Sequence, residues 1–121
     1  METFDSKIAT LAATLVQQQL GEKHEKAYRS LCESFPFMIY HSGLQKTIAF
    51  LKHKAKTAGE YKALDGHLEK QFDMLGFPSM KSNMTSRQLR INTTFAARIA
   101  LWHKRIAQAV IEKEKEKEEQ S

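Results

Sequence analysis

The chain has 121 residues, of which 41% are apolar and 27% are charged, and its formal net charge is +5. Such a length and composition are typical of one globular domain with a single hydrophobic core. No apolar run approaches the roughly 18 residues needed to cross a bilayer, and the N-terminus lacks the features of a signal peptide, so we expect neither a membrane span nor secretion. The single cysteine, Cys32, cannot form an internal disulfide, which favours a reducing, cytoplasmic location. We expect Cys32 to be a small buried hydrophobe.

The first half of the chain is predicted to be helical, because its apolar residues recur with helical spacing and no sustained alternation indicates a strand. The pattern predicts one helix from residue 4 to about 21 and another from about 22 to 33. Pro36 then predicts a short separate helix, since proline is tolerated in a first helical turn. Gly43 follows as a turn, which we expect to let the apolar cluster at 35–40 pack beside the next helix.

The second half continues with helices predicted at about 44–57 and 61–75, a loop at 76–84 and a long helix from about 86 to 110. The last helix opens with a capping-box pattern at 85–88. We expect its buried face to consist of six apolar residues: Ile91, Phe95, Ile99, Trp102, Ile106 and Val110.

These patterns predict an all-α fold, a single-domain helical bundle of about five to six helices over residues 1–111. Residues 112–121 form a charged Glu/Lys tail that offers no apolar face, so we expect it to fray.

The positive charge is clustered along the chain. Residues 112–119, EKEKEKEE, contain five Glu and three Lys, a net of −2, so the rest of the chain carries +7. Residues 34–59 contain four lysines and residues 81–105 contain six basic residues, and neither segment contains Asp or Glu. Such clustering fits a polyanionic partner, usually a nucleic acid.

Four arginines of the last helix are predicted to form one stripe. At 100° per residue, Arg87, Arg90, Arg98 and Arg105 fall within an arc of about 80°, about 100° from the centre of the predicted apolar face. They extend over about 27 Å along the flank of the helix. The planar guanidinium group suits phosphate oxygens, so the stripe is a candidate phosphate-binding surface.

The lysines after Gly43 are more dispersed. Lys46 is predicted to lie opposite the core face of its helix, and Lys52 and Lys54 at its sides, which suits a diffuse electrostatic surface. Phe50 is predicted to point away from the core face. Either another helix of the same chain covers Phe50, or a partner protein does.

Catalytic and metal-binding patterns are missing from the sequence. His24 and Glu25 begin an HExxH pattern, but position 28 is Tyr28 rather than histidine. The five glycines are scattered and form no phosphate loop. We expect the remaining histidines to be solvated or to cap helices: His41, His53, His67 and His103. We also expect no cofactor, no metal and no enzymatic activity.

The segments FPFMIYHSGLQKTIAFLKHKA and ALWHKRIAQA together resemble parts of the small helical subunit of type III-B CRISPR effector complexes, the Cmr complex. Residues 35–55, FPFMIYHSGLQKTIAFLKHKA, resemble that family's GL-xx-T-x-AFL segment. Residues 100–109, ALWHKRIAQA, are similar to its last-helix segment, in which Trp102 is followed by the basic pair Lys104 and Arg105 and by alanines. Each motif alone has low specificity, but their combination in a small, basic, all-helical chain is more specific.

The resemblance implies a non-catalytic structural subunit with a role in antiviral defence. Several copies would stack inside the complex against other Cmr subunits, with their basic faces along the duplex of guide RNA and target RNA. Lys104 and Arg105 carry over from the motif, whereas the other candidates rest on the charge pattern. The candidate RNA-binding residues are Lys46, Lys52, Lys54, Arg87, Arg90, Arg98, Lys104 and Arg105.

Two alternatives stay open. The small subunit of type III-A complexes is also small, helical and basic, although the GL-xx-T-x-AFL segment favours type III-B. A helical protein–protein adaptor would use the same basic face to bind an acidic partner.

Overall fold

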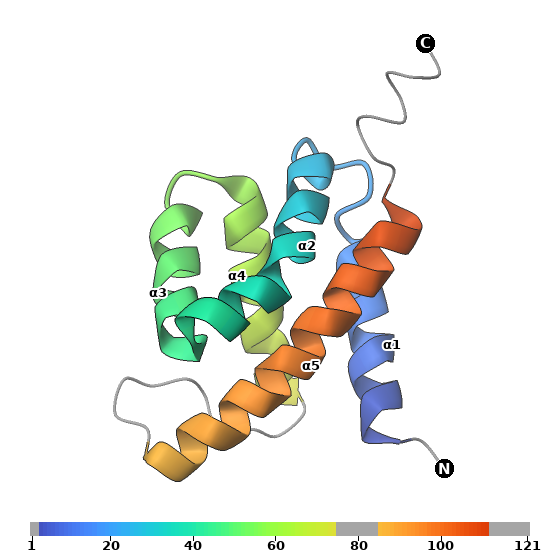
Figure 1. Ribbon diagram of the computed structural model, residues 1–121. Coiled ribbons are helices and arrows are strands. Elements are labelled where there is room, and N and C mark those ends of the chain that lie inside the picture. The colour runs from blue at the N-terminus through green and yellow to red at the C-terminus, as the bar shows by residue number, and fades with distance from the viewer. Residues whose placement is uncertain (1–2, 75–84, 112–121) are drawn as a thin grey trace.

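The computed structural model describes residues 3–74 and 85–111, and these residues form helices and no strand (Figure 1). The predicted loop at 76–84 and the tail at 112–121 lie outside the described residues. The all-α prediction is confirmed, with five helices: α1 (Phe4–Gln17), α2 (Glu25–Ser42), α3 (Leu44–Ala55), α4 (Gly59–Met74) and α5 (Ser86–Val110).

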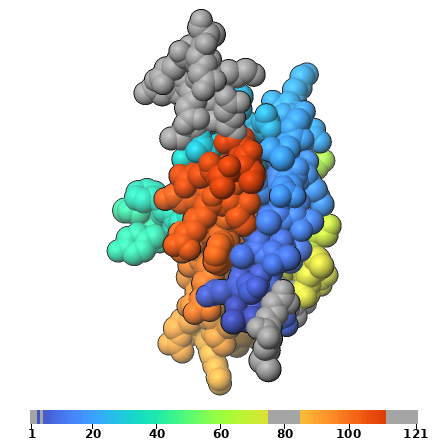
Figure 2. All heavy atoms as spheres, turned by 90° about the vertical axis from the view of Figure 1, so that its right-hand side faces the viewer, coloured from blue at the N-terminus to red at the C-terminus, as the bar shows by residue number. Residues whose placement is uncertain are grey.

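Helices α2 and α5 form the centre of the bundle. Figure 1 shows α5 lying across the front of α2, with α3 to one side of α2 and α1 to the other, and α4 packs against α3, α2 and α1. Helix α1 packs along α5, and Figure 2 shows the two helices side by side on one surface of the molecule. None of the described helices is long and apolar enough to cross a membrane.

Helix α2 is continuous through Pro36, so the prediction of a separate short helix was wrong. Proline inside a helix removes one backbone hydrogen bond and costs about 3 kcal/mol. The apolar face continues on both sides of it, because Phe35 and Ile39 are almost completely buried, and this burial offsets the cost. The helix ends at Gly43, which has a φ of 81° and donates its N–H to the carbonyl of Ile39 at 2.9 Å, as the predicted turn requires.

Helix α5 begins with the predicted capping box. The Thr85 hydroxyl accepts from the backbone N–H of Gln88, and the Gln88 side chain accepts from the backbone N–H of Thr85, both at 3.1 Å. These two bonds satisfy donors that a helix N-terminus otherwise leaves without a partner.

The buried face of α5 differs from the prediction. Ile91 is 45% exposed and Val110 is 37% exposed, while Trp102 and Ile106 are only partly buried against the core. The true buried face is turned by about 70° around the helix, because small and polar residues allow α5 to pack closely against its neighbours. This face consists of Asn92, Phe95, Ala96, Ile99, Ala100, His103 and Ala107.

A buried polar network joins α2, α4 and α5. The hydroxyl of Tyr28 lies 2.8 Å from Nδ1 of His67 and 3.3 Å from Nδ1 of His103, and Nε2 of His103 is bonded to the side-chain oxygen of Gln71. A neutral imidazole has one donor and one acceptor nitrogen. His103 therefore donates to Gln71 and accepts from Tyr28, while His67 donates to the Tyr28 oxygen.

The expectation that His67 and His103 are solvated or capping was wrong, since both rings are buried between helices. Burial lowers the pKa of His67 to about 4, with a smaller effect from the charge of Lys70. Burial also lowers the pKa of His103 to about 3. Both rings are therefore neutral near pH 7, as the hydrogen bonds require.

The two histidines predict a loss of stability in mild acid. Because their pKa values are lowered in the folded state, the unfolded chain binds more protons below about pH 6.5. The free energy of unfolding should fall by about 1 to 2 kcal/mol per histidine between pH 7 and pH 5, measured by urea denaturation. His103→Gln should flatten this pH dependence, and the matched variant His53→Gln, at an exposed site, should not. Equal pH dependence in the two variants would show that the burial of His103 does not contribute to the pH dependence of stability.

Removing the hydroxyl at the centre of the network should also destabilise the fold. Tyr28→Phe leaves the facing nitrogens of His67 and His103 without their shared partner, which costs about 1–3 kcal/mol. Tyr40→Phe is the matched control, because Tyr40 is 86% exposed. Urea denaturation of the two variants measures the difference, and equal stabilities would contradict the proposed importance of the network.

Candidate nucleic-acid interface

Three helical segments contain no acidic residue: residues 34–42 at the end of α2, the whole of α3 and the whole of α5. Together α3 and α5 carry all eight of the predicted basic residues. The structure therefore distributes the candidates over two helices rather than one compact pocket.

The arginine stripe lies on the outer side of α5. Arg87, Arg90, Arg98 and Arg105 are all exposed. Because the buried face is turned from its predicted position, its centre is about 170° from the arginines rather than the predicted 100°. The stripe thus faces solvent opposite the core, along the helix that crosses the front of the molecule in Figure 1.

Two of these arginines have neighbours that orient them. Arg98 lies 3.8 Å from a carboxylate oxygen of Asp5 in α1, and both side chains are more than half exposed, so the pair contributes little stability. The guanidinium of Arg105 lies over the ring of Trp102, 5.4 Å from its centre, in a cation–π contact. Lys104 is half-buried.

The lysines of α3 differ in their surroundings. Lys52 binds two carboxylates of α4, Asp65 at 3.3 Å and Glu69 at 2.5 Å. The hydrogen bond that Lys52 donates to Glu69 contributes most to raising the pKa of Lys52. Lys46 is exposed, and Lys54 lies 5.9 Å from the centre of the Phe50 ring.

The acids that face Lys52 are 13 and 17 residues away in sequence. A scan of the segment from 34 to 59 therefore could not find them. The charge of Lys52 is already balanced by these two carboxylates, which distinguishes Lys52 from the other candidates.

Phe50 is covered in part by the same chain. Its ring meets the ring of Tyr61 in α4 edge to face, with 5.6 Å between the centroids, and 41% of the residue remains exposed. The first of the two sequence alternatives is therefore correct in part, because α4 of the same chain covers part of the ring.

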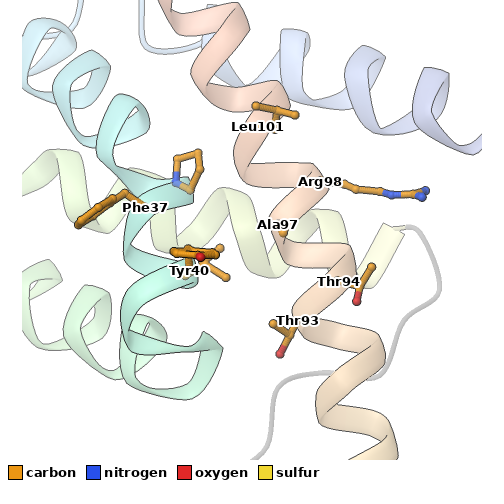
Figure 3. Close-up of a pocket in the computed structure, with 9 residues that line it drawn as sticks. Phe37, Tyr40, Thr93, Thr94, Ala97, Arg98 and Leu101 are labelled. Atoms are coloured by element: carbon orange, nitrogen blue, oxygen red, sulfur yellow. The ribbon is translucent and has the colours of Figure 1, made fainter.

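A groove of about 800 Å³ runs between the end of α2 and the middle of α5 (Figure 3). Pro36, Phe37 and Tyr40 line it from α2, and Ala97 and Leu101 line it from α5. Its lining is mainly apolar.

Sequence reasoning missed the exposed aromatic residues of this groove. The cluster at 35–40 was expected to pack beside the next helix, and Phe35 and Ile39 are buried. However, Phe37 is 62% exposed and Tyr40 is 86% exposed. Helical spacing carried through Pro36 would have found them, because it places Phe37 and Tyr40 away from the buried side.

The buried thiol of Cys32 and the buried hydroxyl of Tyr28 have structural roles. Burial raises the pKa of the Cys32 thiol to about 12, which keeps it protonated and unreactive, and the expectation of a buried Cys32 is confirmed. Burial likewise raises the pKa of Tyr28. Within residues 3–74 and 85–111, no group of three or more acidic, histidine or cysteine side chains is placed to hold a metal ion.

Comparison with known proteins identifies one family. The family described as CRISPR-associated protein (Cas_Cmr5) matches residues 4–110, which include all five helices. No curated protein and no solved structure matches the chain. The match covers most of the chain, confirms the resemblance to the small subunit of type III-B complexes, and favours that type over type III-A. The chain therefore belongs to the CRISPR-associated Cmr5 family and is a subunit of the Cmr type.

Proposed function

We propose that the protein is a non-catalytic, structural subunit of a type III-B CRISPR interference complex that binds the backbone of RNA. Several copies stack along the duplex of guide RNA and target RNA, next to the other Cmr subunits. Family membership supports a place in such a complex. The single observation that carries the RNA contact is the outer side of α5, where four arginines are exposed on a helix without acids.

The proposed contact is electrostatic. Arg87 and Arg105 are about 27 Å apart along α5, so the stripe spans several phosphates of one strand. Each phosphate that an arginine neutralises releases condensed counterions, and binding weakens steeply as salt rises. Contacts to phosphates position a protein on RNA without reading bases, which suits a subunit that must accept any guide sequence.

Stacking explains how a modest surface on one copy is sufficient. Copies that are held in a row bind the same RNA at a high effective concentration, so weak single contacts add to a tight one. Lys46 and Lys54 of α3 and the half-buried Lys104 extend the proposed surface beyond the stripe. Lys52 contributes less in this proposal, because Asp65 and Glu69 already pair with it.

Neutralising the stripe should make RNA binding less dependent on salt. The triple variant Arg87→Gln, Arg98→Gln, Arg105→Gln removes about three phosphate contacts, so the slope of log affinity against log salt should become shallower by about 2 to 3. Fluorescence anisotropy of the assembled complex with a guide–target duplex measures the slope. Circular dichroism checks that the helices remain. An unchanged slope would contradict the proposed stripe.

Lys52 provides the matched control for the loss of charge. Lys52→Gln should leave the salt slope unchanged, and it should lower stability by less than about 1 kcal/mol, as is usual for exposed ion pairs. A slope that becomes shallower by about 1 would instead show that Lys52 contacts a phosphate, as its sequence neighbourhood predicts.

A further inference from the structure

Exposed aromatic rings gather at the end of α2. Phe37 stacks on His41 with 4.0 Å between the ring centroids and 34° between the ring planes. Tyr40 meets the edge of the same His41 ring at 5.6 Å. Folding normally buries aromatic rings because they carry much apolar area, so rings that remain this exposed indicate a ligand surface.

Helix α5 supplies the opposite wall of the groove, which is lined by Thr93, Thr94, Ala97, Arg98 and Leu101. Thr93, Ala97 and Leu101 are spaced by four residues and therefore lie one above the other in a line on the helix. Figure 3 shows Tyr40 on the side of α2 that faces α5, and Thr93 and Ala97 on the side of α5 that faces α2. The hydroxyl of Thr93 donates to the carbonyl of Leu89 at 2.7 Å. The lining of the groove is thus mainly apolar, and the Thr93 hydroxyl is already engaged by the backbone of α5.

Basic residues stand at both ends of this line. Arg90 lies three residues before Thr93, and Lys104 lies three residues after Leu101, so both continue the line at helical spacing. They are about 21 Å apart along α5. Neither the end of α2 nor α5 contributes a carboxylate. Arg98 points to the other side of α5, toward α1, where Asp5 lies (Figure 3).

Flat apolar surface between two cations matches the chemistry of unpaired nucleotides. A base offers an aromatic face for stacking, and its neighbouring phosphates offer negative charge. We propose that the groove between α2 and α5 holds a short run of unpaired RNA nucleotides, with a base stacked on Tyr40 and phosphates farther along the strand on each side at Arg90 and Lys104. The acidic side chains of a protein helix would match the two cations, but they would not match the apolar middle of the groove. A nucleotide matches both, because its phosphate is negative and its base has an apolar face.

This inference rests on the proposed function, because the groove opens beside the arginine stripe that is assigned to RNA phosphates. It adds a preference that phosphate contacts cannot give. Bases in a duplex are already stacked on their neighbours, so only single-stranded or extruded nucleotides reach Tyr40. Because stacking on an aromatic ring accepts every base, the contact should be tolerant of sequence.

The test compares single-stranded and duplex RNA on the full chain. The probe is a mixed-sequence RNA of about 12 nucleotides carrying 2-aminopurine, whose fluorescence is quenched on stacking. Tyr40→Leu, alone and with Phe37→Leu, should weaken single-strand binding about tenfold and reduce the quenching on binding. Duplex affinity and the salt slope should stay as in the wild type, because no phosphate contact is removed. Phe50→Leu, at a half-exposed aromatic residue outside the groove, should change nothing.

Three results would overturn the inference. Unchanged single-strand affinity and quenching in the Tyr40 and Phe37 variants would leave the groove without a role in RNA binding. If the Tyr40 and Phe37 variants no longer copurify with Cmr subunits but keep their RNA affinity, the groove binds a protein instead. Equal binding of the guide–target duplex by complexes assembled with the wild-type chain and with the triple arginine variant would remove the proposed function as well. The proposed function survives the first two results.

Discussion

The fold depends on the buried contact of one tyrosine with two neutral histidines. Tyr28 of α2 bonds to His67 of α4 and to His103 of α5, and these bonds connect helices that are far apart in sequence. A polar group inside a core is stable only when its partners are in place. The contact therefore permits one rotation of α5 about its axis, the rotation that points His103 inward. With His103 inside, helical geometry places Arg98 and Arg105 on the opposite, solvent side. The rotation of α5 therefore determines both which residues form the core and which form the candidate RNA surface.

The same packing decides which charges remain available. Helix α4 brings Asp65 and Glu69 against Lys52, while α1 brings Asp5 only loosely against Arg98. A cation that is already paired with carboxylates attracts a phosphate less strongly than an exposed one. The basic surface is therefore concentrated on the outer side of α5. The apolar groove at its edge follows from the continuity of α2, which carries Tyr40 and Phe37 past Pro36 to the surface beside α5.

Much of this fold could be predicted from the sequence, because helical periodicity and capping are local properties. The capping box at Thr85 and the turn at Gly43 were found in this way. The errors arose where tertiary packing overrode a local rule. Pro36 indicated a break, yet the burial of Phe35 and Ile39 keeps the helix intact. The spacing of apolar residues indicated Ile91 as core, yet the buried face of α5 contains Ala96, Ala100 and Ala107 instead. The partners of Lys52, His67 and His103 are remote in sequence, so no local pattern reveals them.

The central claim is that the outer side of α5 faces RNA in the assembled complex. A photo-crosslinking amino acid placed at Thr94, an exposed position among the arginines, tests this contact directly. The same amino acid at Lys62, an exposed position on α4, serves as the comparison. We predict crosslinks to RNA from position 94 and none from position 62. Crosslinks from position 94 to protein subunits alone would contradict the claim.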